Sequence, residues 1–139
     1  MGFFSNQLKS STFFESEYTV KTIMPVAKVM SAHANWKTRL NKFMEGTLGY
    51  KLDPEVLLQA NDTELGRWIL QADTMEMGAA KKDLLTQLYQ ANLELHQLAS
   101  RIARNIHGGR GEDITGEKEK FQNIAKQVTY LLLDMSLEN

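Results

Sequence analysis

The sequence predicts an all-α protein, an antiparallel helical bundle of three long and two short helices, organised like a four-helix bundle. In three long segments the apolar residues recur at steps of three and four, the period of an amphipathic helix. Strand-like alternation of apolar and polar residues is absent. Helices that each carry one apolar stripe can bury it only against one another, and 139 residues suffice for a core without disulfides.

The first long helix is expected between about Tyr18 and Glu45. His33 lies inside its apolar stripe. Pro25 lacks a backbone N–H, so the helix either begins near Met24 with this proline in its first turn or kinks there, and the first alternative is simpler. The stripe consists of Ile23, Val26, Val29, Met30, Trp36, Leu40, Phe43 and Met44.

Two short helices are expected next. Gly46 and Gly49 end the first helix, and Asp53-Pro54-Glu55 offers an N-cap followed by a proline at the first helical position. Asn61-Asp62-Thr63-Glu64 has the polar-x-x-Glu spacing of a capping box and opens the second short helix. Gly66 inside that helix costs about 1 kcal/mol relative to alanine, which predicts a close backbone contact.

Two further long helices complete the bundle. One runs from Ala79 to His107 and is stopped by two glycines, with Asn92 and His96 on its inward face. The other follows a polar loop that extends to Gly116. The inward apolar residues are Leu85, Leu88, Leu95, Ala99, Ile102 and Ile106 in the earlier helix, and Phe121, Ile124, Ala125, Val128, Leu131, Leu132 and Met135 in the later one.

We expect a single domain over residues 18–139, preceded by an aromatic N-terminal segment over residues 1–17. This segment contains Phe3, Phe4, Phe13 and Phe14. Such a concentration of aromatic side chains is expected to pack against the bundle itself or against a partner chain.

Composition excludes several classes of function. The 16 basic and 17 acidic residues give a pI near 6.3, so neither nucleic acid nor an anionic membrane surface is an expected partner. No apolar run reaches about 18 residues, which argues against membrane insertion. The absence of cysteine and of a secretory signal favours a cytoplasmic location. No phosphate-binding loop, G-x-S-x-G, H-E-x-x-H or EF-hand motif occurs, so we expect no enzyme activity.

Three polar residues stand on helix faces that should be apolar: His33, Asn92 and His96. Two interpretations are open. Each histidine is a neutral core residue bonded to a backbone carbonyl or to Asn92, or the three side chains converge as a functional site.

Three motifs containing these residues resemble the chemoreceptor zinc-binding domain family. His33-Ala-Asn-Trp36 matches H-x-x-W, Thr63-Glu-Leu-Gly-Arg-Trp68 matches C-x-L-G-x-W, and Asn92-Leu-Glu-Leu-His96 stands in place of H-x-x-x-H. The resemblance covers about residues 24–106. It implies a cytoplasmic helical bundle, often homodimeric, that is attached to or works beside chemotaxis receptors and diguanylate cyclases and holds zinc with three histidines and one cysteine.

Two of those four zinc ligands are replaced in this chain. His33 and His96 match the first and last histidine, whereas Thr63 stands at the cysteine and Asn92 at the third ligand. A hydroxyl and a carboxamide are poor substitutes in a tetrahedral zinc site, so we expect no bound cofactor and instead a hydrogen-bonded network of the four side chains. The alternative is a weak zinc site of His33 and His96 with a carboxylate from Asp62 or Glu64, residues that helix capping explains more simply.

These observations predict a non-enzymatic, cytoplasmic sensory or protein-interaction module. A homodimer that binds a signalling protein of a chemoreceptor or diguanylate cyclase pathway is expected. Protonation of the histidines around pH 6 is expected to disturb the packing of the helices. Weak divalent-metal binding is one alternative function, and a purely structural scaffold is the other.

Overall fold

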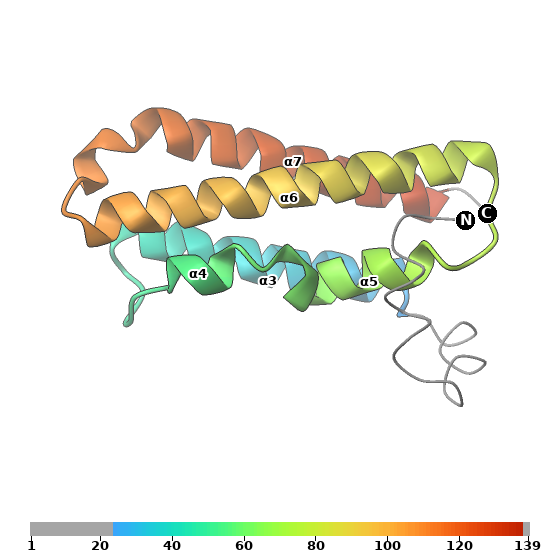
Figure 1. Cartoon of the computed structure of the whole chain (residues 1–139), viewed down its shortest axis with the longest axis horizontal. Helices are drawn as coiled ribbons and strands as arrows, with labels where there is room; N and C mark the ends of the chain where they lie inside the picture. Colours follow the sequence, from blue (N-terminus) through green and yellow to red (C-terminus); the bar gives the residue numbers. More distant parts are fainter. Residues whose placement is uncertain (1–23, 138–139) are drawn as a thin grey trace.

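The computed structural model describes residues 24–137 and confirms the all-α bundle (Figure 1). No strand occurs among these residues. The α-helices are α3 (Val26–Glu45), α4 (Pro54–Leu57), α5 (Glu64–Ala72), α6 (Ala79–His107) and α7 (Thr115–Leu137), and two short 3₁₀ helices are η1 (Ala60–Asp62) and η2 (Gly111–Asp113). None of the helices in the described part of the chain has the length and apolar character needed to cross a membrane.

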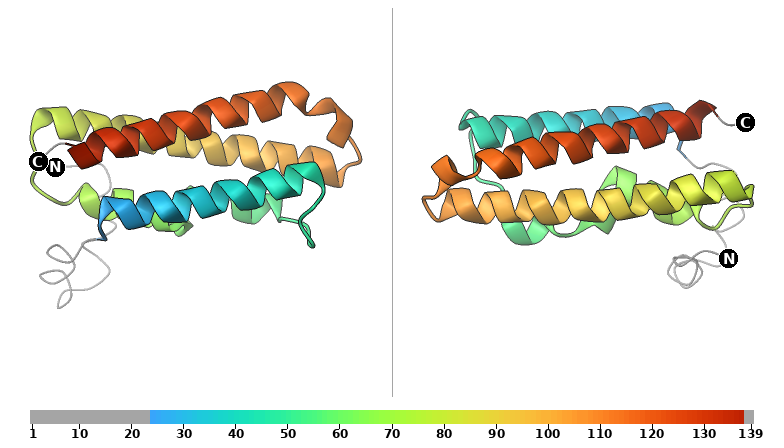
Figure 2. Two further views of the ribbon diagram at one scale, coloured as in Figure 1. Left: turned by 180° about the vertical axis from the view of Figure 1, so that it is seen from behind. Right: turned by 90° about the horizontal axis from the view of Figure 1, so that it is seen from above.

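The helices form four antiparallel rods, with α4, η1 and α5 in succession making up the second rod. In Figure 1 this rod lies in front of α3 and below α6, and the rear view of Figure 2 shows α3 beside α7. Helix α6 packs on α4, α5 and α7, and α3 packs on α5 and α7, so the four rods enclose one core. The predicted aromatic segment 1–17 and the start of the predicted domain at residue 18 lie outside the described residues.

Helix α3 begins at Val26, and Pro25 is its N-cap with extended backbone angles of φ −61° and ψ 146°. The proline therefore precedes the helix, and its missing N–H removes no helical hydrogen bond. A helix that runs through Met24 and kinks at Pro25 is wrong. The indole Nε1–H of Trp68 donates to the carbonyl of Met24 at 2.9 Å, which fixes the point where the chain enters the bundle.

The predicted stop of α3 and start of α4 are confirmed. Gly46 caps α3 with a left-handed φ of 78°, a conformation that glycine adopts without steric cost. The Asp53 carboxylate accepts the backbone N–H of Glu55 at 2.9 Å, and Pro54 is the first residue of α4. Helix α4 is a single turn.

The N-cap of α5 is Thr63, which corrects the predicted capping box. Asn61 and Asp62 belong to η1, so neither caps the helix, and Glu64 is its first residue. The Thr63 hydroxyl accepts the N–H of Gly66 at 3.0 Å. The chain makes a 3₁₀ turn before the helix, and this turn moves the capping position two residues beyond the start of the predicted motif. The close contact expected at Gly66 is confirmed, because a Cβ there would lie 1.9 Å from the Ala60 carbonyl oxygen.

The bounds predicted for α6 are confirmed, and α7 begins at Thr115, before Gly116. The predicted polar loop between them is therefore shorter and contains η2. The inward residues predicted for both helices are buried, except Ile106, which is half-buried near the end of α6.

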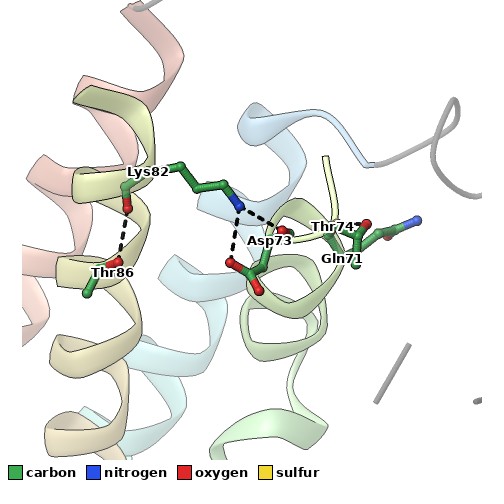
Figure 3. A network of polar contacts seen from close by, with 5 residues as sticks. All are labelled: Gln71, Asp73, Thr74, Lys82 and Thr86. Carbon is green, nitrogen blue, oxygen red and sulfur yellow. Dashed lines mark hydrogen bonds and ion pairs between the residues drawn. The ribbon is translucent and has the colours of Figure 1, made fainter. Parts of the chain in front are cut away.

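An ion pair joins the end of α5 to the start of α6 (Figure 3). The Lys82 ammonium donates to the backbone carbonyl of Asp73 at 2.7 Å and to its carboxylate at 3.3 Å, and Asp73 is buried. A buried carboxylate is costly without a partner, so this contact fixes α5 against α6. The polar stretch predicted after Ala72 thus contains a specific link between two helices.

Candidate functional site

A groove of about 740 Å³ lies between α3 and the segment that runs from α4 to the start of α5, with α6 as its floor. We call it the α3–α4 groove. The four residues predicted as a site, His33, Thr63, Asn92 and His96, all line it, and so does Trp36. The structure therefore brings together side chains from two long helices and one helix cap.

His96 is buried, and its ring is held by the end of α4. Nδ1 lies 2.9 Å from the carbonyl oxygen of Leu57, which can only accept, so Nδ1 carries the proton. The other nitrogen, Nε2, is then an acceptor with a lone pair. The Trp36 ring lies against the imidazole, with centroids 4.6 Å apart and planes tilted by 34°. Burial lowers the pKa of His96, and the hydrogen bond to Leu57 opposes this effect in part.

His33 is also buried, one helical turn before Trp36 on α3. Its Nε2 makes a long contact of 3.5 Å with the carbonyl oxygen of Ala125 in α7. The His33 and Trp36 rings are stacked, with their centroids 6.3 Å apart. Burial lowers the pKa of His33 to about 4; the hydrogen bond to the Ala125 carbonyl opposes this effect, and the charges of Lys37 and His96 add smaller decreases. Both histidines are therefore neutral at neutral pH.

Asn92 carries an unusual polar atom. The side chain is 2% exposed, and its Oδ1 has no hydrogen-bond donor among the residues that the structure describes. An unsatisfied buried acceptor costs about 1–3 kcal/mol, so Asn92 does not contribute to stability through this atom. We refer to His33, Asn92 and His96 together as the histidine cluster.

The predicted hydrogen-bonded network of the four side chains is wrong, whereas the interpretation of each histidine as bonded to a backbone carbonyl is confirmed. Thr63 is bonded to its own backbone: its hydroxyl donates to Ala60 and accepts from Gly66. The physical reason is that the last carbonyls of a helix lack intrahelical partners, and the end of α4 presents one to His96.

Sequence reasoning missed the residues that hold α4 in place. The Ser100 hydroxyl donates to the Pro54 carbonyl at 2.8 Å, and Arg104 forms an ion pair with Glu55. Together with His96 these residues follow a four-residue spacing along α6, so they form one polar stripe facing α4. That spacing was visible in the sequence, but its partners were not.

The zinc ligand set that the resemblance implies does not fit this chain. Within residues 24–137 no three His, Cys, Asp or Glu side chains are grouped so that they could hold one ion. Asp62 and Glu64 line the groove as exposed residues and do not complete such a group with the histidines. The Thr63 hydroxyl is already used as a helix cap, so it cannot replace a thiolate.

Comparison with known proteins adds no family to this description. No protein-family model, no curated protein and no solved structure matches the chain. The resemblance in the motifs around His33, Thr63 and Asn92 therefore stays a prediction, and the geometry of the groove carries the functional argument.

Proposed function

We propose that this chain is a non-enzymatic sensory or protein-interaction module in which the histidine cluster controls how α4 packs on the bundle. One observation carries the proposal: buried His96 bonds directly to the carbonyl of Leu57, in the last turn of α4. Helix α4 is one turn long and buries one apolar side chain, Leu57. Its position therefore depends strongly on the polar contacts that α6 provides.

In this proposal, protonation of the two imidazoles changes the position of α4. A proton on either buried ring creates a charge that the core does not solvate, and two charged rings repel each other. Movement of α4 away from α6 would open the groove and let water reach both rings. The surface that α4 presents to a partner would then change. The other charged residues lining the groove are exposed at its rim: Lys28, Arg39, Asp53, Asp62 and Glu64.

The module belongs, in this proposal, to a cytoplasmic signalling system. The motif resemblance points to a homodimer that works beside a chemotaxis receptor or a diguanylate cyclase. A purely structural scaffold with the same fold would keep its partner binding when His33 and His96 are both replaced by leucine. The sensory module would lose its response to the stimulus in that variant.

The pKa of His33 sets the expected pH dependence. Because this pKa is about 4 in the folded protein and 6.5 in an unfolded chain, the unfolded state binds more protons between these values. The contribution of His33 to the free energy of unfolding is complete above pH 6.5 and falls as the pH drops towards 4. The total loss from His33 is about 3 kcal/mol, and His96 acts in the same direction. The native His33 ring therefore stays neutral around pH 6, although stability already declines there because the unfolded chain binds the proton.

Urea unfolding at several values between about pH 7.5 and 4.5 tests this prediction. Between these pH values the unfolding free energy of the wild type should fall by about 2–3 kcal/mol more than that of His33→Leu. His107→Gln is the control, because His107 is exposed at the end of α6 and outside the groove. It should keep the wild-type loss. Equal pH dependence in wild type and His33→Leu would show that the cluster does not link protonation to packing.

A second candidate function, weak binding of a divalent metal, is favoured by the arrangement of His96. A metal-binding histidine commonly donates its other N–H to a carbonyl, as Nδ1 of His96 does to Leu57, and this leaves Nε2 free as a ligand. The unpartnered Oδ1 of Asn92 is a second donor atom on the same groove. Two or three neutral ligands would give a weak site.

Elemental analysis of protein purified without chelator, followed by titration with Zn²⁺, tests the metal function. If the metal function is right, we expect one saturable Zn²⁺ site with a Kd below about 100 µM. His96→Leu should abolish this binding, and His107→Gln should keep it. No saturable binding in that range, or equal binding in the two variants, would eliminate this second candidate.

A further inference from the structure

The α3–α4 groove exposes apolar surface that a folded chain ordinarily covers. Its apolar lining includes Met24, Trp36, Leu52, Val56, Leu57 and Leu65. Val56 is 62% exposed, and Trp36 is only half-buried. A contiguous apolar hollow of this size, with a charged rim, is the kind of surface that binds another segment or molecule.

The groove begins where the described chain begins. Met24 is the first described residue, it lines the groove, and the indole of Trp68 holds its carbonyl. Trp36 lies 12 residues further along, which is about 18 Å at the helical rise. Phe13 and Phe14 precede Met24 by 11 and 10 residues, and an extended stretch of that length spans at most about 35 Å. Either aromatic side chain can therefore reach Trp36.

The composition of residues 1–23 matches this surface. The segment contains four of the six phenylalanines of the chain. Glu15 and Glu17 directly follow the Phe13–Phe14 pair, and Lys28 and Arg39 stand at the α3 rim of the groove. A segment joined to the groove by about ten residues has an effective concentration in the millimolar range, which favours it over a second copy of the chain in dilute solution.

We propose that residues 1–23 of the same chain bind in the α3–α4 groove, with Phe13 and Phe14 against Trp36, and cover the histidine cluster. The segment is thus an internal ligand of the groove. This inference goes beyond the proposed function and does not depend on it, because it rests on the apolar lining and on the position of Met24.

Disulfide trapping in the full chain tests the proposal, since the chain contains no cysteine of its own. Thr12→Cys is combined with Asn35→Cys, an exposed position in the groove beside Trp36. The matched control combines Thr12→Cys with Gln127→Cys, exposed on α7. Gln127 lies at a similar height along the bundle, because Ala125 contacts His33. Both pairs are oxidised mildly, and their products are separated without reductant.

We expect the groove pair to form an intramolecular disulfide at least about tenfold faster than the control pair. Equal rates would overturn the proposal, since they would reflect random encounters of a tethered segment. A predominant disulfide-linked dimer that disappears on dilution would also overturn it, because the occupant would then be a second copy.

A second measurement uses tryptophan fluorescence in variants of the whole chain, where Trp36 is half-buried and the other tryptophan, Trp68, is buried. Phe13→Ser/Phe14→Ser should raise the acrylamide quenching constant about twofold, because one face of the indole loses its cover. Phe3→Ser/Phe4→Ser is the control. The proposal places Phe13 and Phe14, and not these two residues, against Trp36, so quenching should stay at the wild-type value. An unchanged quenching constant in the Phe13/Phe14 variant would contradict the proposal.

Discussion

Replacement of Gly66 by alanine is expected to destabilise the bundle by about 3 kcal/mol or more. The new Cβ would lie 1.9 Å from the carbonyl oxygen of Ala60 and 2.8 Å from the Cα of Asn61. Both atoms belong to the backbone, so no side chain can rotate away, and η1 must separate from α5. Alanine ordinarily stabilises a helix by about 1 kcal/mol relative to glycine. A loss of stability at this site therefore reports the close contact alone.

Gly116→Ala provides the matched control. Gly116 also lies in a helix, and a Cβ added there would meet no atom within 4 Å. Urea unfolding should give a small gain for Gly116→Ala, up to about 1 kcal/mol, and the large loss for Gly66→Ala. If the two variants have similar stability, the close approach of α5 and η1 is wrong. The groove would then also be wrong, because Thr63 and Leu65 line it from the same turn.

Truncation of Phe121 to alanine is expected to cost about 3–5 kcal/mol. Phe121 is 0% exposed, and its ring centroid lies 5.9 Å from that of Trp36. The Trp36 indole in turn lies against His96. The cavity left by the ring would remove the support behind Trp36. We therefore expect a change in tryptophan emission as well as lower stability.

Tyr130→Ala on the same helix is the control for this truncation. Tyr130 is 58% exposed, so its removal should change the unfolding free energy by no more than about 0.5 kcal/mol. A small effect of Phe121→Ala, or an unchanged tryptophan signal, would mean that α7 does not support the aromatic side of the groove.

Hydrophobic periodicity predicted the long helices well because their stripes and glycine stops are local features. The Ala79–His107 helix is bounded as predicted, and Pro25 excludes a continuous helix before Val26. The prediction placed the N-cap of α5 at the wrong residue, and the cause is also local. Several neighbouring polar residues can satisfy a capping pattern, and the 3₁₀ turn that selects Thr63 depends on packing of Ala60 against Gly66.

The composition of the site was predictable, and its bonding was not. Polar residues on apolar faces identified His33, Asn92 and His96 as buried neighbours. Their partners are carbonyls of Leu57 and Ala125, which are distant in sequence and are brought close only by the packing of α4 and α7. The low pKa of His33 likewise follows from burial that a single sequence does not specify.

Hydrogen exchange of the α4 amides tests the central claim, that the histidine cluster controls the packing of α4, most directly. The amides of Leu57 and Leu58 are bonded within this turn, to Asp53 and Pro54. The exchange rate is compared at about pH 7.5 and 5.5, after division by the intrinsic rate at each pH. From the pKa of His33 alone, opening that hydrates the ring should become about tenfold more populated at the lower pH. We expect this rise in the wild type and its loss in His33→Leu/His96→Leu. An unchanged opening population in the wild type, or the same rise in the double variant, would contradict it.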